Sequence, residues 1–281
     1  MMFKRLLTVL LFLFASTSVY SQLSKTHYIP PVAGQNVSDH MIYISTPSTG
    51  YINVTIKPIG GTRTDWIART VSNDDPWSFS TGTGRGDIIR DINGLNGVIN
   101  NSGYIIESQG LTYVSFRFNS PLVTQGGQNF NYHSGAYVSK GESALGSRLR
   151  TATFTNSAGN ASGNGEPQHF ISIIATQDNT KVTLSDFPPG IEFTNNDLAG
   201  AQTSPLVLPV LNENETYILG FSPSHSQSST IQEALIGALV SSEDNLGGAD
   251  AKPVVVVSGS IGGSLRNGTW QNTDYGLDQI T

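Results

Sequence analysis

Apolar and polar residues alternate along several short segments in the first half of the chain. The alternation has a period of two residues, and it occurs in four segments, 41–45, 51–56, 103–107 and 113–118. This period is typical of a β-strand that places one face on a core and the other in water. Proline and glycine follow the first two segments, at Pro47, Pro58 and Gly60, and mark turns. The four segments are therefore predicted strands.

Two later segments, 170–175 and 254–257, are runs of apolar residues. Such runs are expected of strands that are covered on both faces. A helical period is limited to a turn or two at 143–149. We therefore predict an all-β fold.

The chain contains an internal repeat. Residues 42–56 align with residues 171–184 when one residue is inserted in the first copy, and both copies end in Val-Thr followed by an aliphatic residue. Each copy is a strand, a polar turn and a second strand, which predicts a β-hairpin. Downstream, the first copy has two segments that echo two in the second, 97–99 and 114–116 against 237–240 and 254–258.

The repeat predicts two strand-rich modules, at 22–155 and 166–281. Between them, residues 156–165 are rich in Gly, Asn and Ser and are expected to form a flexible linker or loop. We expect the modules to be packed β-sandwiches. The alternative is a partial β-propeller, because repeated modules can also close radially.

The first 21 residues have the pattern of a secretory signal peptide. Lys4 and Arg5 are basic, residues 6–14 are almost entirely apolar, and small polar residues lead to a cleavage site between Ser21 and Gln22. The apolar run is too short to cross a membrane, which takes about 20 residues. We therefore expect a protein that is secreted or held on the outer cell surface.

Composition narrows the partners and the chemistry. After loss of Lys4 and Arg5, 13 of the 15 basic residues remain against 21 acidic ones, a formal net charge of −8. The mature chain has no run of basic residues, which argues against nucleic acid and anionic membranes as partners. It has no second long apolar run for a transmembrane helix. The absence of cysteine excludes thiolate zinc sites and cysteine nucleophiles and favours a bacterial exporter.

The motifs predict no catalytic, metal or cofactor site. The five histidines are not at metal-ligand spacing. Residues 141–145, Gly-Glu-Ser-Ala-Leu, approach the Gly-x-Ser-x-Gly nucleophile elbow, but Leu145 replaces the last glycine. The acidic turns at 74–75 and 243–244 lack the spacing of a calcium-binding loop.

Ligand binding is therefore assigned to loops with exposed aromatic residues. The loops at 73–87 and 125–135 are rich in glycine, asparagine and aromatic residues. Loops on a rigid sheet scaffold are the usual place for recognition residues. The candidate ligand-binding residues in these loops are Trp77, Arg85, Asp87, Phe130 and Tyr132.

Several segments carry a resemblance to a known family. They are residues 23–31, 139–141, 144–146, 174–182, 211–217, 252–260 and 274–280. The Ala-Thr-x-Asp-Asn-Thr block at 175–180 and the closing Asp278-Gln279 are the most specific parts. The mature chain resembles the N-terminal modules of large surface proteins of gliding Gram-negative bacteria, which carry a domain similar to the N-terminal domain of mammalian IgG-Fc-binding proteins.

The resemblance implies a secreted, adhesin-like module, exported by a gliding-linked type IX route, with further domains beyond Thr281. It supplies no catalytic residue. Our leading hypothesis is a non-enzymatic binding or adhesion module whose partner is an extracellular glycan, a mucin, or a host or cell-surface protein. One alternative is a polysaccharide-acting enzyme or its accessory module, which would need two carboxylates among Glu107, Glu142, Glu166 and Asp178. Another is a structural spacer in a surface filament.

Overall fold

In the part of the chain that the structure describes, the fold consists of β-strands and two short 3₁₀-helices. The computed structural model describes residues 22–34, 38–82, 88–91, 94–119, 122–125, 128–131, 134–152, 155–156, 168–221, 233–248, 250–264 and 273–281. The 3₁₀-helices are η1 (Arg63–Asp65) and η3 (Gly141–Ala144). Within these residues no helix is long and apolar enough to span a membrane. The predicted all-β class is confirmed.

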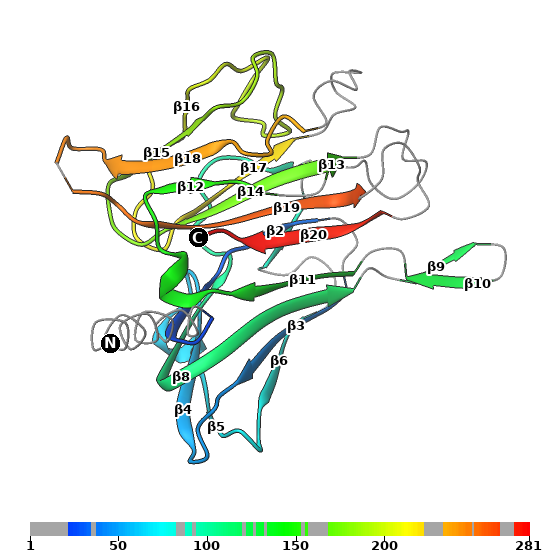
Figure 1. The fold of residues 1–281 in the computed structure, drawn as a ribbon, viewed down its shortest axis with the longest axis vertical. Helices are drawn as coiled ribbons and strands as arrows, with labels where there is room; N and C mark the ends of the chain where they lie inside the picture. The colour runs from blue at the N-terminus through cyan, green and yellow to red at the C-terminus, as the bar shows by residue number, and fades with distance from the viewer. Residues whose placement is uncertain are drawn as a thin grey trace, which may run out of the picture.

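The first unit of the fold is one curled sheet of seven strands. These are β1 (Ser24–Ile29), β3 (Ser38–Ser45), β4 (Ile52–Pro58), β5 (Ile67–Val71), β6 (Trp77–Gly82), β8 (Tyr104–Asn119) and β11 (Ser134–Ser139). β8 is 16 residues long, and its first half pairs with β1 and β4 while its second half pairs with β3 and β11. The sheet therefore curls along β8 into a half-barrel (Figure 1).

The second unit is a β-sandwich of two sheets. The five-stranded sheet contains β13 (Thr155–Asn156), β14 (Gln168–Ala175), β17 (Thr216–Phe221), β19 (Val254–Ser264) and β20 (Thr273–Gln279). The four-stranded sheet contains β12 (Arg148–Arg150), β15 (Thr180–Ser185), β16 (Leu206–Val207) and β18 (Leu239–Asp244). A sandwich, and not a propeller blade, is thus the architecture of this unit.

Two short strand pairs complete the fold. β2 (Val32–Ala33) pairs in parallel with β7 (Ile89–Arg90), and we call this pair with Ile88 the strap. β9 (Leu122–Gln125) and β10 (Gln128–Asn131) form an antiparallel pair, which projects from the body at the right of Figure 1.

The five-stranded sheet lies between two hydrophobic cores. On one face, Ile171 and Ile173 of β14 belong to the core of the sandwich. On the other face, Phe170 and Val257 belong to the core of the first unit. This arrangement explains the apolar runs at 170–175 and 254–257, and it confirms that these strands are covered on both faces.

The two units share one strand topology. In the first unit β3 pairs with β6 and with the second half of β8, while β4 pairs with β5 and with the first half of β8. In the second unit β14 pairs with β17 and β19, while β15 pairs with β16 and β18. β11 and β20 flank the equivalent strands, as do β1 and β12. The long β8 therefore corresponds to β18 and β19 joined into one strand.

Even the register agrees with the repeat found in the sequence. Val54 pairs with Ser108 in the first unit, and Val182 pairs with Ser242 in the second. The pair Ile42 and Phe116 corresponds in the same way to Ile171 and Ser258. The alignment of residues 42–56 with 171–184 is thus an alignment of equivalent positions in the fold.

The predicted hairpins at 42–56 and 171–184 are wrong. β3 does not pair with β4, and β14 does not pair with β15. The connection at 176–179 instead crosses from one sheet of the sandwich to the other. Four residues can span about 13 Å, which exceeds the roughly 10 Å between packed sheets. A strand–turn–strand pattern fits such an arch as well as it fits a hairpin.

The chain passes from the first unit to the second through η3. β12 and β13 pair with β18 and β19, so the strands of the second unit begin ahead of the predicted linker at 156–165. Residues 157–165 of that linker lie outside the described residues. β11 and β20 lie side by side where the two units meet (Figure 1).

Candidate functional site

The two units differ in what covers one equivalent face. In the second unit, the face of the five-stranded sheet that turns away from its sandwich is sealed by the first unit. β2 lies against β14 and β19, and the strap residues share a core with Phe170, Ile218 and Val257. In the first unit, none of the described residues seals the corresponding face, on β6, β3, β8 and β11, in this way. We call it the open face.

The sequence reflects this difference. The sealed face of the second unit has Phe170, Ile218 and Val257. The strand pairing shows that the equivalent positions of the open face are Met41, Ser78 and Ser115, in that order. In the same way, the position of Gly259 in the second unit corresponds to Arg117 in the first. A terminal repeat with a polar outer face is common in repeat proteins, because no further repeat covers it.

Two cross-strand rows make up the centre of the open face. One row is Ser78, Tyr43, Ser115 and Val138, and the other is Ser80, Met41, Arg117 and Ala136. Residues at alternate positions, such as Ile42, Ile44, Val114 and Phe116, point into the core. The period of two predicted for 41–45 and 113–118 therefore sets which side chains reach the open face.

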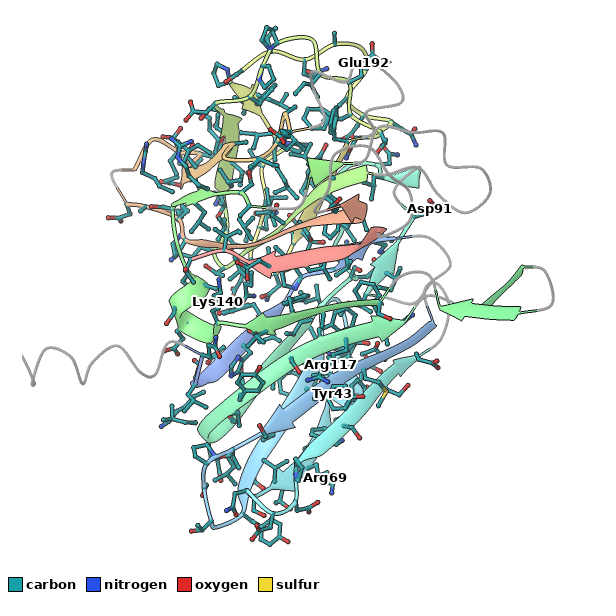
Figure 2. All side chains as sticks on the ribbon, turned by 45° about the vertical axis from the view of Figure 1, so that its right-hand side comes forward. Tyr43, Arg69, Asp91, Arg117, Lys140 and Glu192 are labelled. Carbon is teal, nitrogen blue, oxygen red and sulfur yellow. The ribbon has the colours of Figure 1, made fainter. Side chains whose placement is uncertain are left out.

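Tyr43 and Arg117 form the chemical centre of the open face. The Arg117 guanidinium lies 5.0 Å from the centre of the Tyr43 ring, within the range of a cation–π contact. Tyr43 is 39% exposed, and Arg117 is also exposed. Figure 2 shows the two side chains next to each other on the outside of the curled sheet. The open face thus exposes an aromatic ring and a cation side by side.

Ser115 lies between Tyr43 and Val138 in its row. It is 2% exposed, and its hydroxyl has no hydrogen-bond partner among the described residues. A buried hydroxyl without a partner costs free energy and needs an explanation. Its place beneath the open face makes it part of the candidate site.

Of the five sequence-predicted binding residues, Trp77 is the one whose side chain the structure describes. Trp77 is only 7% exposed and belongs to the core, with its ring 5.8 Å from that of Phe79. The 73–87 region is therefore partly strand, since β6 starts at Trp77 and turns this side chain inward. Arg85, Asp87 and Tyr132 lie outside the described residues, and Phe130 is described only as a backbone position of β10.

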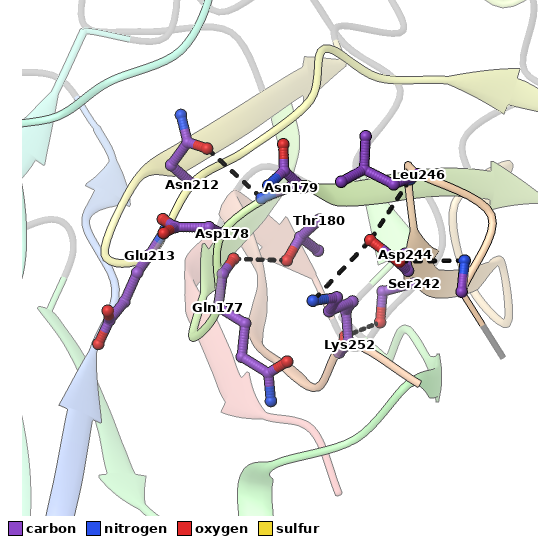
Figure 3. Close-up of polar contacts among 11 residues, drawn as sticks. Gln177, Asp178, Asn179, Thr180, Asn212, Glu213, Ser242, Asp244, Leu246 and Lys252 are labelled. Carbon is purple, nitrogen blue, oxygen red and sulfur yellow. Dashed lines mark hydrogen bonds and ion pairs between the residues drawn. The ribbon is translucent and has the colours of Figure 1, made fainter. Parts of the chain in front are cut away.

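The most specific block of the resemblance has a structural role. Residues 175–180 form the arch between β14 and β15 (Figure 3). The Thr176 hydroxyl donates to the Pro253 carbonyl at 2.6 Å, and the Thr180 hydroxyl donates to the Gln177 carbonyl at 2.7 Å. The Asp178 carboxylate accepts from the Glu213 N–H at 3.0 Å. These side chains tie three loops together and are used by the chain itself.

The acidic turn at 243–244 is likewise held by contacts within the chain. The Asp244 carboxylate accepts the N–H of Gly248 at 3.0 Å and that of Leu246 at 3.4 Å, and it lies 3.9 Å from the Lys252 ammonium (Figure 3). Among the described residues no group of three His, Asp or Glu side chains could hold a metal ion.

Of the four carboxylates considered for hydrolysis, two have partners within the chain. Glu107 forms an ion pair with Lys57 at 2.6 Å, and Asp178 is held in the arch. Glu166 lies outside the described residues.

A cavity of about 320 Å³ near the strap is lined by Ile89, Arg90, Asp91, Gly94, Leu95, Asn96 and Ile99. Its Arg90 is already bound to the Asn101 side chain at 2.7 Å.

Sequence reasoning missed Tyr43 and Arg117. Both were within predicted strands, on the polar side of the alternation, so their exposure followed from the sequence. Their contact did not, because it depends on the register between β3 and β8. The predicted binding residues belong to the 73–87 and 125–135 segments, whereas Tyr43 lies on β3 and Arg117 lies on β8.

The fold defines an all-β protein of two repeated units, one a half-barrel and one a sandwich. The family model described as IgGFc binding protein matches residues 135–281. This is slightly more than half of the chain, and the chain belongs to this family of binding domains. No curated protein and no solved structure matches the chain. The matched region covers β11 and the second unit, so Tyr43 and Arg117 lie outside it.

Proposed function

We propose that this protein is a non-enzymatic binding module of an exported protein and that its open face holds an extracellular glycan or surface protein. One observation carries the proposal. The face that is sealed by the strap in the second unit is not covered by any described segment in the first, and there it presents the Tyr43–Arg117 pair. Membership of a family of binding domains supports a binding role over a catalytic one.

The cellular setting is part of the same proposal. Residues 1–21 are expected to be removed as a signal peptide, which would release the module outside the cell. There it would act in adhesion at the outer cell surface, as one module of a longer surface protein with partners among glycans, mucins and host or cell-surface proteins. A rigid sheet suits this role, since binding then costs little conformational entropy.

The test is binding of the purified protein to an array of neutral and acidic glycans, mucins and extracellular proteins. Tyr43→Ala should abolish the strongest signal. Tyr51→Ala is the matched control, because Tyr51 is 67% exposed but lies in the β3–β4 connection and off the open face. Signals that persist in Tyr43→Ala would contradict the proposal. A folded protein that binds nothing on the array would favour the structural spacer instead.

A further inference from the structure

The two central rows of the open face carry a single charge among their described side chains, and Asp39 is an exposed carboxylate at the bulged end of β3. The outward positions of the open face on β6, β3, β8 and β11 are Ser78, Ser80, Met41, Tyr43, Ser45, Tyr113, Ser115, Arg117, Ala136 and Val138. Arg117 is the charged residue in this set. The Arg117 guanidinium contacts the Tyr43 ring, and no carboxylate of the described residues forms an ion pair with Arg117.

Several other cations of the protein are neutralised by a carboxylate, although Lys25, Arg63 and Arg148 have no ion pair among the described residues. Arg69 pairs with Asp75 at 2.7 Å, Arg150 with Asp186 at 2.8 Å, and Lys181 with Glu243 at 2.8 Å. The chain as a whole has a formal net charge of −6. A guanidinium with no carboxylate partner among the described residues, in two otherwise uncharged rows of an acidic protein, therefore favours an anionic group.

We infer that the open face binds a carboxylate-bearing oligosaccharide, such as one of uronic acids; this rests on the function proposed above. The planar guanidinium of Arg117 matches a carboxylate with two parallel hydrogen bonds. The neighbouring Tyr43 ring offers an apolar surface on which the carbon-bound hydrogens of a pyranose can pack.

The side chains around the pair favour a glycan over a folded protein or a peptide. Ser78 lies beside Tyr43 in its row and Ala136 lies beside Arg117, and both side chains are small. Ser78 and Ser80 add exposed hydroxyls, which suit a partner that is itself rich in hydroxyls. A peptide would be recognised at a strand edge by main-chain bonds, whereas these groups lie on the flat of the sheet.

The experiment uses a uronic-acid tetrasaccharide and its carboxyl-reduced counterpart, with binding measured by calorimetry. The purified protein should bind the acidic sugar about ten- to a hundredfold more tightly than the reduced one, which is the worth of a charge-assisted pair. Arg117→Gln should lose that same factor towards the acidic sugar and nothing further towards the reduced one. Arg69→Gln, which removes the same charge elsewhere, should leave both affinities unchanged.

The outcomes separate this inference from the proposed function. Binding of a neutral glycan or a protein that depends on Tyr43 but not on Arg117 would overturn the anionic sugar and leave the binding role intact. Competition by an oligoglutamate peptide at equal affinity would overturn the sugar and favour an acidic peptide. Binding of no probe, in an array or by calorimetry, would overturn both.

Discussion

The side-chain amide of Gln279 donates a hydrogen bond of 2.8 Å to the main-chain carbonyl of Tyr28. Its oxygen accepts the N–H of Lys140, and the side chain is completely buried. One residue of β20 thereby binds β1 and the turn before η3, which belong to the first unit. The Lys140 ammonium also lies 3.2 Å from the neighbouring Asp278. The Asp-Gln pair that ends the resemblance thus joins the two units.

Replacing this amide should weaken the whole protein. Gln279→Leu removes two hydrogen bonds: the Lys140 N–H loses the Gln279 acceptor, and the Tyr28 carbonyl keeps only a long bond of 3.5 Å from the Ser139 hydroxyl among the described residues. We expect the free energy of unfolding, measured in urea, to fall by about 2–4 kcal/mol. Asp278→Asn is the control: its ion pair is exposed and its loss should cost less than about 1 kcal/mol. Equal effects of the two substitutions would contradict a role for the buried amide.

A hydrogen bond to an equivalent carbonyl occurs in each of the two units. The Thr46 hydroxyl donates to the Leu111 carbonyl at 2.7 Å, and the Thr176 hydroxyl donates to the Pro253 carbonyl at 2.6 Å. The first bond ties the β3–β4 connection to β8, and the second ties the β14–β15 arch to the residue before β19. Thr46→Val and Thr176→Val should each lower the unfolding free energy by about 1 kcal/mol.

The two threonine substitutions should be additive, because they lie in separate units and share no partner. The double variant is expected to lose the sum of the single losses to within about 0.5 kcal/mol. Chemical denaturation of the four proteins in the cycle measures this. A large coupling energy would mean that the two arches are not independent structural elements.

Gly141 is required for a steric reason. It has a φ of +57°, and a Cβ atom placed there would collide with the Ser24 side chain. Gly141→Ala should therefore cost both backbone strain and a clash, about 3 kcal/mol or more in unfolding free energy. Gly190→Ala provides the comparison, since its φ is +86° but nothing lies within 4 Å of the added atom. Its cost should be limited to about 1–2 kcal/mol of strain.

Several strands of this fold were predicted from the sequence, but their partners were not, and the segments 103–107 and 113–118, predicted as two strands, form the single strand β8. The alternation at 51–56 gave β4 and its buried side chains Val54 and Ile56. The repeat gave the equivalence of 42–56 and 171–184. Neither pattern specified whether the two strands of a copy pair, because pairing is set by contacts with β8, or with β18 and β19, far along the chain.

The prediction that Trp77 is an exposed binding residue was wrong for a related reason. Its neighbours at 73–76 are turn residues, which suggested an exposed loop. The tertiary structure begins β6 at Trp77 and pairs it with Ile44, and this register directs the ring to the core. Burial of a large aromatic side chain stabilises more than any contact it would make in a loop.

His27 is the remaining titratable group with a structural consequence. It is fully buried, and its Nε2 lies 3.0 Å from the Thr112 carbonyl and 3.3 Å from that of Ser24. Since both are acceptors, Nε2 carries the proton of a neutral ring, and Nδ1 has no partner within the described residues. Burial lowers the pKa of His27 from 6.5 to about 4, although the neighbouring main-chain groups partly oppose this.

The lowered pKa predicts that acid weakens the fold. Between pH 6.5 and pH 4 the unfolded chain binds a proton at His27 that the folded chain does not, so stability falls as the pH drops through this window. Relative to neutral pH, the loss from this group should be about 2 kcal/mol at pH 5. His27→Gln keeps a donor for the Thr112 carbonyl but cannot titrate. Urea unfolding at pH 7 and pH 5 should therefore show a smaller loss for the variant than for the wild type, by that amount. Equal losses in the two proteins would mean that His27 is not a buried neutral ring.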